Sequence, residues 1–156
     1  MKALLQRVRC ASVTVGSQCV GSIEHGLLVF LGLDKGDDRG AADRMLDKLL
    51  QYRVFSDDEG RMNRSVVDVS GAVLLISQFT LSADTRKGLR PSFSSALPPS
   101  EANPLYDYML AQLQLRHPRV ASGVFGADMQ VSLVNDGPVT FLLEVQGSDQ
   151  PVQGEG

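Results

Sequence analysis

Two short polar segments hold the residues of this chain whose types and spacing could do chemistry. The segment from Ser77 to Thr80, Ser-Gln-Phe-Thr, follows a run of apolar residues. Hydroxyl and amide side chains at the end of a buried strand either bond to nearby backbone groups or line a pocket, and both interpretations stay open. The segment from Asn135 to Pro138, Asn-Asp-Gly-Pro, separates two alternating segments. It is typical of a hairpin turn, and its Gly–Pro bond could take either isomer.

The sequence lacks the common catalytic signatures. It has no Gly-x-Ser-x-Gly elbow, no His-Glu-x-x-His motif, no phosphate loop and no dinucleotide fingerprint. Its soft metal ligands are Cys10, Cys19, His25 and His117, and they do not show the paired spacing of a zinc site. We therefore expect neither a metal nor another cofactor. His117 stands where a histidine favourably meets a helix C-terminus, and a Ser-His-Asp triad has no support.

Length and charge bound the class of protein. A chain of 156 residues fits one domain, and its net charge of −3 provides no global basic field for nucleic acid. A nucleic-acid partner would need a local patch, and Arg86, Lys87 and Arg90 form the best one. A solvated charge cluster is the other interpretation. The sequence contains no apolar run of about 18 residues, no signal peptide and no disulfide framework, so we expect a cytoplasmic location away from membranes.

The elements that must position these segments are strands and two helices. An apolar stripe at helical spacing predicts a helix over residues 39–52, capped by the polar loop before it, and a second over residues 100–117, ended by Pro118. Residues 26–33 suit a strand buried on both faces, and residues 82–99 suit a long functional loop. The other predicted strands span residues 4–15 (one bent strand or two, with the bend at residues 10–12), 71–81, 129–134 and 139–145. The predicted helical stripes are Ala42, Met45, Leu46 and Leu49, then Leu105, Tyr108, Met109 and Leu113.

These elements predict the α+β fold class, a single domain with a β-rich core of mostly antiparallel or mixed strands covered by two main helices. The predicted domain spans residues 1–146. Residues 147–156 are rich in glycine and poor in apolar residues, so we expect a disordered C-terminal tail.

Taken together, the two polar segments resemble the signature motifs of D-aminoacyl-tRNA deacylases, which are chiral editing enzymes. The motifs are Ser77–Leu81 and Asn135–Thr140, and neither departs from the family pattern. The likeness covers nearly the whole chain up to Val145. It extends through Gln6–Val8, Ala11–Val13, Tyr52–Asp57, Arg90–Phe93, Tyr106–Tyr108 and Ala127–Val134.

The resemblance implies a homodimer with its active site at the subunit interface. It would hydrolyse the ester that joins a D-amino acid to the terminal adenosine of tRNA, releasing both, and would also act on glycyl-tRNA while rejecting L-aminoacyl-tRNA. DNA and membranes are not expected partners. The implied catalytic residues are Ser77, Gln78, Phe79 and Thr80.

The resemblance also implies a chiral filter. Gly137 and Pro138 would form a cis dipeptide whose carbonyl groups face the substrate from across the interface, with Arg7 holding it in place. Excluding the L configuration near Cα is more general than fitting every D side chain. For Arg7 a surface ion pair is the alternative. Phe125 and Met129 would line the adenosine pocket, or simply pack in the core.

The chemistry suits these residue types. An aminoacyl ester is already activated, so its hydrolysis needs a placed water and stabilisation of the developing oxyanion. Backbone N–H groups near Gln78 and Phe79 could supply that stabilisation. In the family the 2′-hydroxyl of the terminal adenosine is thought to assist. Thr80 has no neighbouring base, so we assign it to shaping the site, with nucleophile as its lesser role.

Three other functions stay open. A non-catalytic RNA-binding homodimeric module would retain tRNA without cleaving it. A structural homodimer would do neither. A sister-class deacylase would carry a trans Gly–Pro bond and hydrolyse L-alanyl-tRNA.

Overall fold

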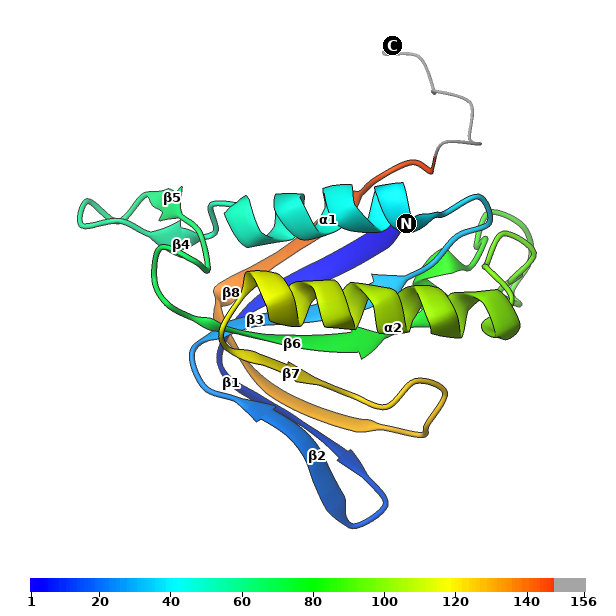
Figure 1. The fold of residues 1–156 in the computed structure, drawn as a ribbon, viewed down its shortest axis with the longest axis horizontal. Coiled ribbons are helices and arrows are strands. Elements are labelled where there is room, and N and C mark those ends of the chain that lie inside the picture. The colour runs from blue at the N-terminus through cyan, green and yellow to red at the C-terminus, as the bar shows by residue number, and fades with distance from the viewer. Residues whose placement is uncertain (148–156) are drawn as a thin grey trace.

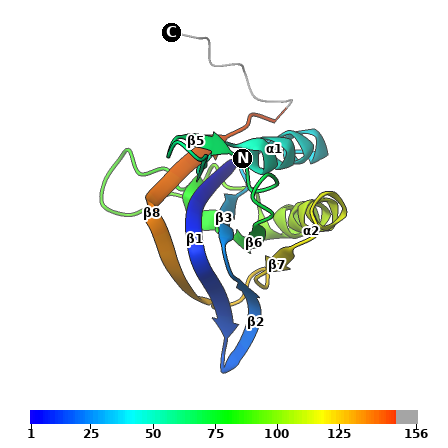
Figure 2. The same ribbon diagram turned by 90° about the vertical axis from the view of Figure 1, so that its left-hand side faces the viewer.

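A long N-terminal strand runs through the middle of the sheet. In the computed structural model, which describes residues 1–147, β1 (Lys2–Val15) pairs along most of its length with antiparallel β8 (Gln130–Glu144). On its other side it pairs first with β3 (Gly26–Gly32) and then with β2 (Gln18–Ile23). β6 (Ala72–Ser77) is parallel to β3, and β7 (Val120–Ser122) is parallel to β6. The sheet is strongly curved (Figures 1 and 2), and the predicted α+β class with mixed strands is confirmed.

Two helices cover one face of the sheet, as Figure 2 shows. They are α1 (Arg39–Gln51) and α2 (Pro99–Arg116). The Asp38 carboxylate accepts a hydrogen bond from the Ala41 N–H (2.8 Å), which confirms the predicted cap of the first helix. α2 ends at His117, before Pro118, as predicted. No helix within residues 1–147 is long and apolar enough to cross a membrane.

The core has two parts, which lie on opposite faces of β3. Leu27, Val29 and Leu31 face the helices and belong to the larger cluster, whereas Leu28 joins the smaller cluster inside the curved strands. The strand is therefore buried on both faces, as predicted. Each fully buried leucine contributes about 1.5–3 kcal/mol to folding. The predicted stripe of α1 is also buried.

The stripe of α2 differs from the prediction at one position. Leu105, Met109 and Leu113 are buried, but Tyr108 is half-buried and Tyr106 takes its place in the core. The Tyr108 hydroxyl instead donates to the Asp43 carboxylate of α1 (2.9 Å). A tyrosine at a helix–helix border keeps its polar end accessible because the hydroxyl needs a partner.

The predicted strand over residues 71–81 is too long. β6 ends at Ser77, and the chain turns into a short 3-10 helix, η1 (Phe79–Ser82). The turn packs over the end of β3, where a side chain on Gly32 would place its Cβ 2.8 Å from Leu81 Cβ. The apolar pattern continues through this turn because Leu81 is still partly covered, so the pattern does not mark the end of the strand.

The predicted hairpin at residues 135–138 is wrong. Both flanking segments belong to the single strand β8, because Thr140 pairs with Gln6 and Asn135 pairs with Val8 of β1. Residues 136–139 therefore bulge outward opposite the one residue Arg7. A bulge and a turn need similar residue types, and only the pairing partner distinguishes them.

Several other elements were not predicted. They are β2, β7 and the small hairpin of β4 (Phe55–Ser56) and β5 (Met62–Arg64). β1 is one continuous strand, and its register against β8 shifts between Val8 and Cys10, near the predicted bend. Of the predicted tail, residues 148–156 lie outside the described residues.

Candidate active site

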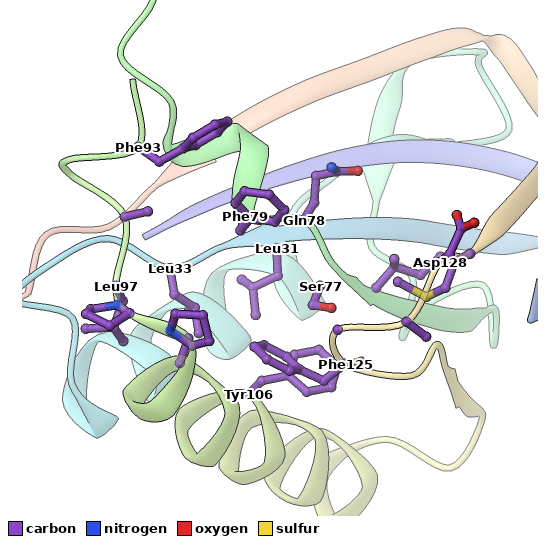
Figure 3. A pocket seen from close by; sticks show the side chains of 18 of the residues that line it. Leu31, Leu33, Ser77, Gln78, Phe79, Phe93, Leu97, Tyr106, Phe125 and Asp128 are labelled. Carbon is purple, nitrogen blue, oxygen red and sulfur yellow. The ribbon is translucent and has the colours of Figure 1, made fainter. Parts of the chain in front are cut away.

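A cavity of about 660 Å³ opens where β3 and β6 end, and Figure 3 shows its lining. Side chains from three other regions close it: the start of α2, the loop before α2 and the segment before β8. Most are apolar. The polar residues of its wall include Ser77, Gln78, Lys35 and Asp128. A mostly apolar cavity with a few polar groups is typical of a small-molecule site.

Ser77, Gln78 and Phe79 line this cavity, and Thr80 follows them outside its lining. The backbone of this segment differs from the expectation in one respect. The Gln78 N–H is not free, because it donates to the Leu31 carbonyl oxygen (2.7 Å). Phe79 and Thr80 open the 3-10 helix, and the first N–H groups of a helix have no intrahelical acceptor. Neither N–H has another acceptor among the described residues. The available amide donors are therefore those of Phe79 and Thr80.

The side chains of this segment carry no base. The Gln78 amide donates a hydrogen bond to the Thr80 hydroxyl, and an amide cannot accept the proton of that hydroxyl as a base would. The Phe79 ring is 62% exposed and packs at 5.1 Å between centroids against Phe93. Thr80 therefore has no base beside it, and Phe79 is the residue of this pair that lines the cavity.

The floor of the cavity is built on Tyr106. Its hydroxyl donates to the Leu75 carbonyl oxygen (3.0 Å), and its ring lies 5.7 Å from that of Phe125. Burial raises the pKa of Tyr106 far above its ordinary value, so the phenol stays neutral. The hydrogen bond joins α2 to β6 three residues before Gln78.

Phe125 and Met129 fit both of the interpretations that the sequence left open. Both line the cavity, and each is partly buried against one of the two core clusters. Gly123 leaves room for the Met129 side chain, because a Cβ at position 123 would lie 2.6 Å from the Met129 sulfur.

The Gly137–Pro138 pair lies elsewhere in the chain, on the exposed bulge of β8. Its peptide bond is cis, as the resemblance implies. Gly137 has a φ of 139°, and a Cβ there would lie 2.6 Å from Val139 Cγ2 and 3.2 Å from Arg7 Nη2. Only glycine fits this position without displacing a neighbour.

Arg7 holds the bulge from beneath. Its Nε donates to the Asp136 carbonyl oxygen (3.0 Å), and its Nη1 donates to the Val54 carbonyl oxygen (2.7 Å). Arg7 also forms an ion pair with Asp136, but its side chain is only 12% exposed, so the pair is mostly buried and not on the surface. The Asp136 carboxylate is farther from Arg7 Nε, at 3.6 Å.

Asn135 braces the bulge from its start, a role that the sequence did not reveal. Its amide donates to the Arg7 and Val139 carbonyl oxygens (3.0 and 2.9 Å), and its oxygen accepts from the Val139 N–H (3.1 Å). The side chain thus satisfies the backbone on both sides of the bulge. In the sequence, Asn135 only indicates a turn, because Arg7, one of its two hydrogen-bond partners, is 128 positions away.

The predicted site residues therefore form three groups within one chain. Ser77, Gln78 and Phe79 line the cavity together with the two predicted adenosine-pocket residues. Arg7, Gly137 and Pro138 form the second group and do not line it.

The basic patch forms a third group, on the exposed loop between η1 and α2, and it does not line the cavity either. Arg86 is bound by two hydrogen bonds to the Asp84 carboxylate (2.9 and 2.7 Å), and these lower the pKa of Asp84 to about 2. Arg86 is therefore partly neutralised, whereas no carboxylate among the described residues forms an ion pair with Lys87 or Arg90. Within residues 1–147, no three His, Cys, Asp or Glu side chains are grouped as a metal site would require.

Comparisons with a family model and with known relatives agree on one protein family. A family model described as D-Tyr-tRNA(Tyr) deacylase matches residues 4–144. A D-aminoacyl-tRNA deacylase of Stutzerimonas stutzeri is 62% identical over 144 residues, which are 92% of this chain and 99% of the relative. A D-aminoacyl-tRNA deacylase of Cellvibrio japonicus is 59% identical over 145 residues, which are 93% of this chain and 99% of the relative.

Two solved structures share the fold. One, named c-Myc DNA Unwinding Element Binding Protein, has a TM-score of 0.88 and 41% identity and covers 92% of this chain and 98% of its own. The other, described as a probable eukaryotic D-amino acid tRNA deacylase, has a TM-score of 0.78 over 91% of this chain and 97% of its own. At 17% identity, the second supports the fold alone.

Proposed function

The chain belongs to the D-Tyr-tRNA(Tyr) deacylase family, and from this premise we propose that it is an editing hydrolase of D-aminoacyl-tRNA. It hydrolyses the ester between the D-amino acid and the terminal adenosine and releases the free amino acid and tRNA. Glycyl-tRNA is also a substrate, because glycine has no side chain to exclude. The observation that carries the proposal is the pair of free N–H groups at the start of η1, those of Phe79, which lines the apolar cavity, and of the next residue, Thr80.

These two N–H groups stabilise the oxyanion. Attack of water on the ester carbonyl places negative charge on its oxygen, and amide donors at a fixed position stabilise that charge without rearranging. The tetrahedral intermediate then expels the 3′-oxygen of tRNA, which takes a proton as the water loses one. The 2′-hydroxyl beside the ester assists the attack, as the family resemblance implies. Ser77, Gln78 and Thr80 shape this rim, and the Gln78–Thr80 hydrogen bond holds the turn.

The cavity receives the terminal adenosine. Phe125 and Met129 offer an aromatic ring and a polarisable sulfur to the base, and Tyr106 closes the floor beneath them. Lys87 and Arg90 do not line the cavity, so they contact the backbone of tRNA rather than the adenosine. Arg86 contributes less to this contact because Asp84 already binds it.

The chiral filter acts across a homodimer. Gly137 and Pro138 are exposed and do not line the cavity of their own chain, so they reach a substrate only in a partner's cavity. The face of the sheet away from the helices supports a partner, because Phe30, Leu4 and Leu142 follow one another across three strands, and Leu142 is 49% exposed. An apolar row of this kind on an exposed sheet favours burial in an interface.

Paired hydrolysis assays test the activity. D-tyrosyl-tRNA and L-tyrosyl-tRNA are incubated with the purified protein without added metal, and the remaining ester is measured. Rapid loss of the D ester with the L ester spared supports the proposal. Loss of both would mean that the chiral filter is misassigned, and retention of both with tRNA bound would favour the RNA-binding module. Cleavage of L-alanyl-tRNA would favour the sister class.

Mixed dimers test the shared site. A chain with Gly137→Ala and a chain with Phe79→Pro, which removes one N–H, are each expected to be inactive. When they are unfolded together and refolded, mixed dimers regain one complete site, and a quarter or so of the wild-type activity returns, as expected for random pairing. Mixed dimers without activity would refute the shared site. Monomers in light scattering would refute the homodimer.

Two further expectations follow from the proposed substrate. Because one structural relative is named for DNA binding, duplex DNA is included as a competitor, and we expect it not to slow hydrolysis. Inhibition by DNA at tRNA-like concentrations would contradict this. An editing enzyme meets its substrate where tRNA is charged, so we expect the protein in the cytoplasm, and cell fractionation checks this.

A further inference from the structure

The 3-10 turn η1 is seated on the backbone that ends β3. A Cβ on Gly32 would lie 3.2 Å from Ser82 Oγ and 3.3 Å from the Gln78 carbonyl oxygen, so the turn rests directly on the bare backbone there. A carbonyl oxygen on either side of Gly32 holds the turn. The Leu31 oxygen accepts from the Gln78 N–H (2.7 Å), and the Leu33 oxygen accepts from the Ser82 hydroxyl (3.2 Å). The turn is therefore anchored at both of its ends.

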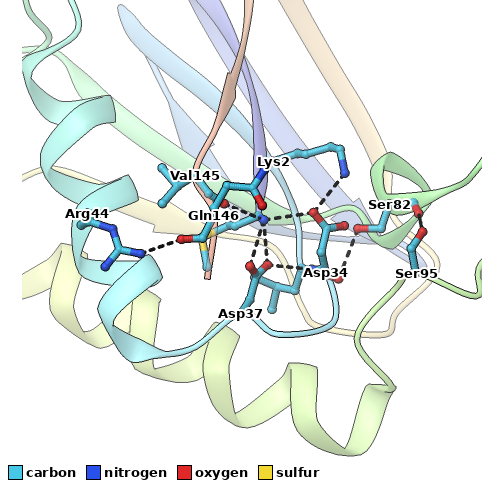
Figure 4. Close-up of polar contacts among 10 residues, drawn as sticks. Lys2, Asp34, Asp37, Arg44, Ser82, Ser95, Val145 and Gln146 are labelled. Carbon is cyan, nitrogen blue, oxygen red and sulfur yellow. Dashed lines mark hydrogen bonds and ion pairs between the residues drawn. The ribbon is translucent and has the colours of Figure 1, made fainter. Parts of the chain in front are cut away.

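The second anchor, Ser82, lies one residue beyond the Ser77–Leu81 motif. It is 1% exposed, the smallest exposed fraction among the buried polar residues of the described chain. Its backbone is held as well, because Ser95 Oγ donates to the Ser82 carbonyl oxygen (2.9 Å), as Figure 4 shows. A buried hydroxyl gains little stability over an apolar group of the same size, so what Ser82 adds here is a directed bond.

The Asp34 carboxylate supports the same anchor. It interacts with the Ser82 hydroxyl and forms an ion pair with Lys2 Nζ (3.0 Å; Figure 4). Burial alone would raise the pKa of Asp34, but the hydroxyl and the ammonium hold it below its ordinary value. A hydroxyl can turn its single proton toward either of two acceptors. The Leu33 oxygen and the Asp34 carboxylate both directly follow β3, so the turn is held with either acceptor.

The two amide donors of the proposed function lie between these anchors. The N–H groups of Phe79 and Thr80 come after Gln78 and before the second anchor. Within the turn, the Ala83 N–H donates to the Thr80 carbonyl oxygen (3.1 Å), which links the donors to the residue after Ser82. The side chains of Phe79 and Thr80 are exposed, so burial fixes neither of them. The direction of the two donors therefore depends on the anchors.

We propose that Ser82 is a positioning residue for the deacylase reaction, because it holds the end of η1 and so directs the Phe79 and Thr80 N–H groups at the ester oxygen. This inference rests on the proposed function, in which those groups stabilise the oxyanion. Ser82 itself does not line the cavity. Amide donors stabilise a developing charge only when they are already aimed at it, and a displacement of about 1 Å can cost about 100-fold in rate.

Ser82→Ala tests the anchor. We expect kcat for D-tyrosyl-tRNA to fall about 10- to 100-fold, whereas KM and the Kd of uncharged tRNA change less than about 2-fold. Ser65→Ala is the matched control. Ser65 is also buried, and its hydroxyl also bonds to backbone, accepting from the Asp68 N–H (3.1 Å), but it does not line the cavity. We expect Tm to fall in both variants and kcat to fall in Ser82→Ala alone.

The outcomes separate this inference from the proposed function. If the wild type cleaves D-tyrosyl-tRNA and Ser82→Ala has the same kcat, Ser82 is not a positioning residue. An equal loss of kcat in Ser65→Ala would also overturn the inference, because general destabilisation would then explain the effect. A wild type that cleaves neither the D nor the L ester would instead overturn the proposed function.

Amide spectra test the geometry without turnover. In protein labelled with nitrogen-15, we expect Ser82→Ala to move the N–H resonances of Phe79 and Thr80, and Ser65→Ala to leave them in place. Unmoved resonances in Ser82→Ala would overturn the inference.

Ser95→Ala is the milder variant, and it serves if Ser82→Ala does not fold. It removes only the bond to the Ser82 carbonyl oxygen, so we expect kcat to fall about 2- to 10-fold with KM unchanged. An unchanged kcat in Ser95→Ala would show that the end of η1 does not need to be held.

Discussion

Arg7 Nε donates a hydrogen bond of 3.0 Å to the carbonyl oxygen of Asp136, directly before the Gly137–Pro138 pair. The two residues are 129 positions apart, and the bond crosses the place where β8 bulges away from β1. Because the second donor of Arg7 bonds to the buried Val54, the guanidinium ties the bulge to the segment that follows α1. The bulge is therefore exposed at its tip but fixed at its base, as the proposed chiral filter requires.

Replacing Arg7 should impair the filter more than the fold. For Arg7→Met we expect kcat/KM for D-tyrosyl-tRNA to fall about 10- to 100-fold, since two hydrogen bonds from a charged donor are lost at about 1.5–3 kcal/mol each and part of the loss is borne by stability. The ratio of D to L hydrolysis should fall with it. Arg9→Met is the matched control: Arg9 also pairs with Asp136, at 3.5 Å, but its side chain is 75% exposed. If both variants behave alike, Arg7 has no special role.

Asn135 should matter for stability. Asn135→Ala removes three hydrogen bonds to partly buried backbone groups, and we expect the free energy of unfolding to fall by about 2–3 kcal/mol and Tm by roughly 4–12 °C. Ser132→Ala, at an exposed position of the same strand, should change Tm by less than about 2 °C. Calorimetry measures both, and equal Tm values would show that the amide does not brace the bulge.

The basic loop should contribute unevenly to tRNA binding. Lys87→Ala together with Arg90→Ala is expected to reduce the slope of log K against log salt by about 1.4–1.8, because each lost phosphate contact changes it by about 0.7–0.9. Arg86→Ala should change it less, since Asp84 already binds that guanidinium. Filter binding of tRNA at several salt concentrations checks this, and an unchanged slope in the double variant would remove the loop from the interface.

The contribution of Asp34 to stability should depend on pH. The pKa of Asp34 is lower in the folded chain than its ordinary value of 3.8, so the unfolded chain binds more protons in the acid range. The stabilisation is therefore complete above that ordinary value and is lost as the pH falls below it, through the folded-state pKa. We expect the Tm difference between the wild type and Asp34→Asn to be constant above about pH 5 and to shrink below 3.8.

Thermal unfolding of both proteins from pH 2.5 to 7 measures this difference. Asp37 provides the control of opposite sign, since burial raises its pKa and its contribution must weaken as the pH rises. If the Tm difference between the wild type and Asp34→Asn stays constant to the lowest pH, the stabilising role of the Asp34 carboxylate is contradicted.

Local patterns were sufficient for the helices and for β3. The stripe of Ala42, Met45 and Leu49 and the eight-residue apolar run from Gly26 carry their own periodicity, so any fold of this chain must bury them. The same patterns predicted a strand that continues past the end of β6, because Leu81 in the η1 turn is also apolar and partly covered. Short elements such as β7 have too few residues to show a period, and they form because β6 offers a free edge.

Local patterns and motifs were enough to identify the family, the two helices, the buried strands and the residue types at each motif. The strand pairing was needed to show that residues 130–144 form one bulged strand and not a hairpin, and that Arg7 and Asn135 hold the bulge. The three-dimensional arrangement also showed that the cavity and the Gly137–Pro138 pair occupy separate places in one chain. It alone placed the Ser82 hydroxyl against the Leu33 carbonyl oxygen. The physical reason is that these contacts join residues more than 30 positions apart, and such pairings are chosen by the packing of whole elements, which no local period encodes.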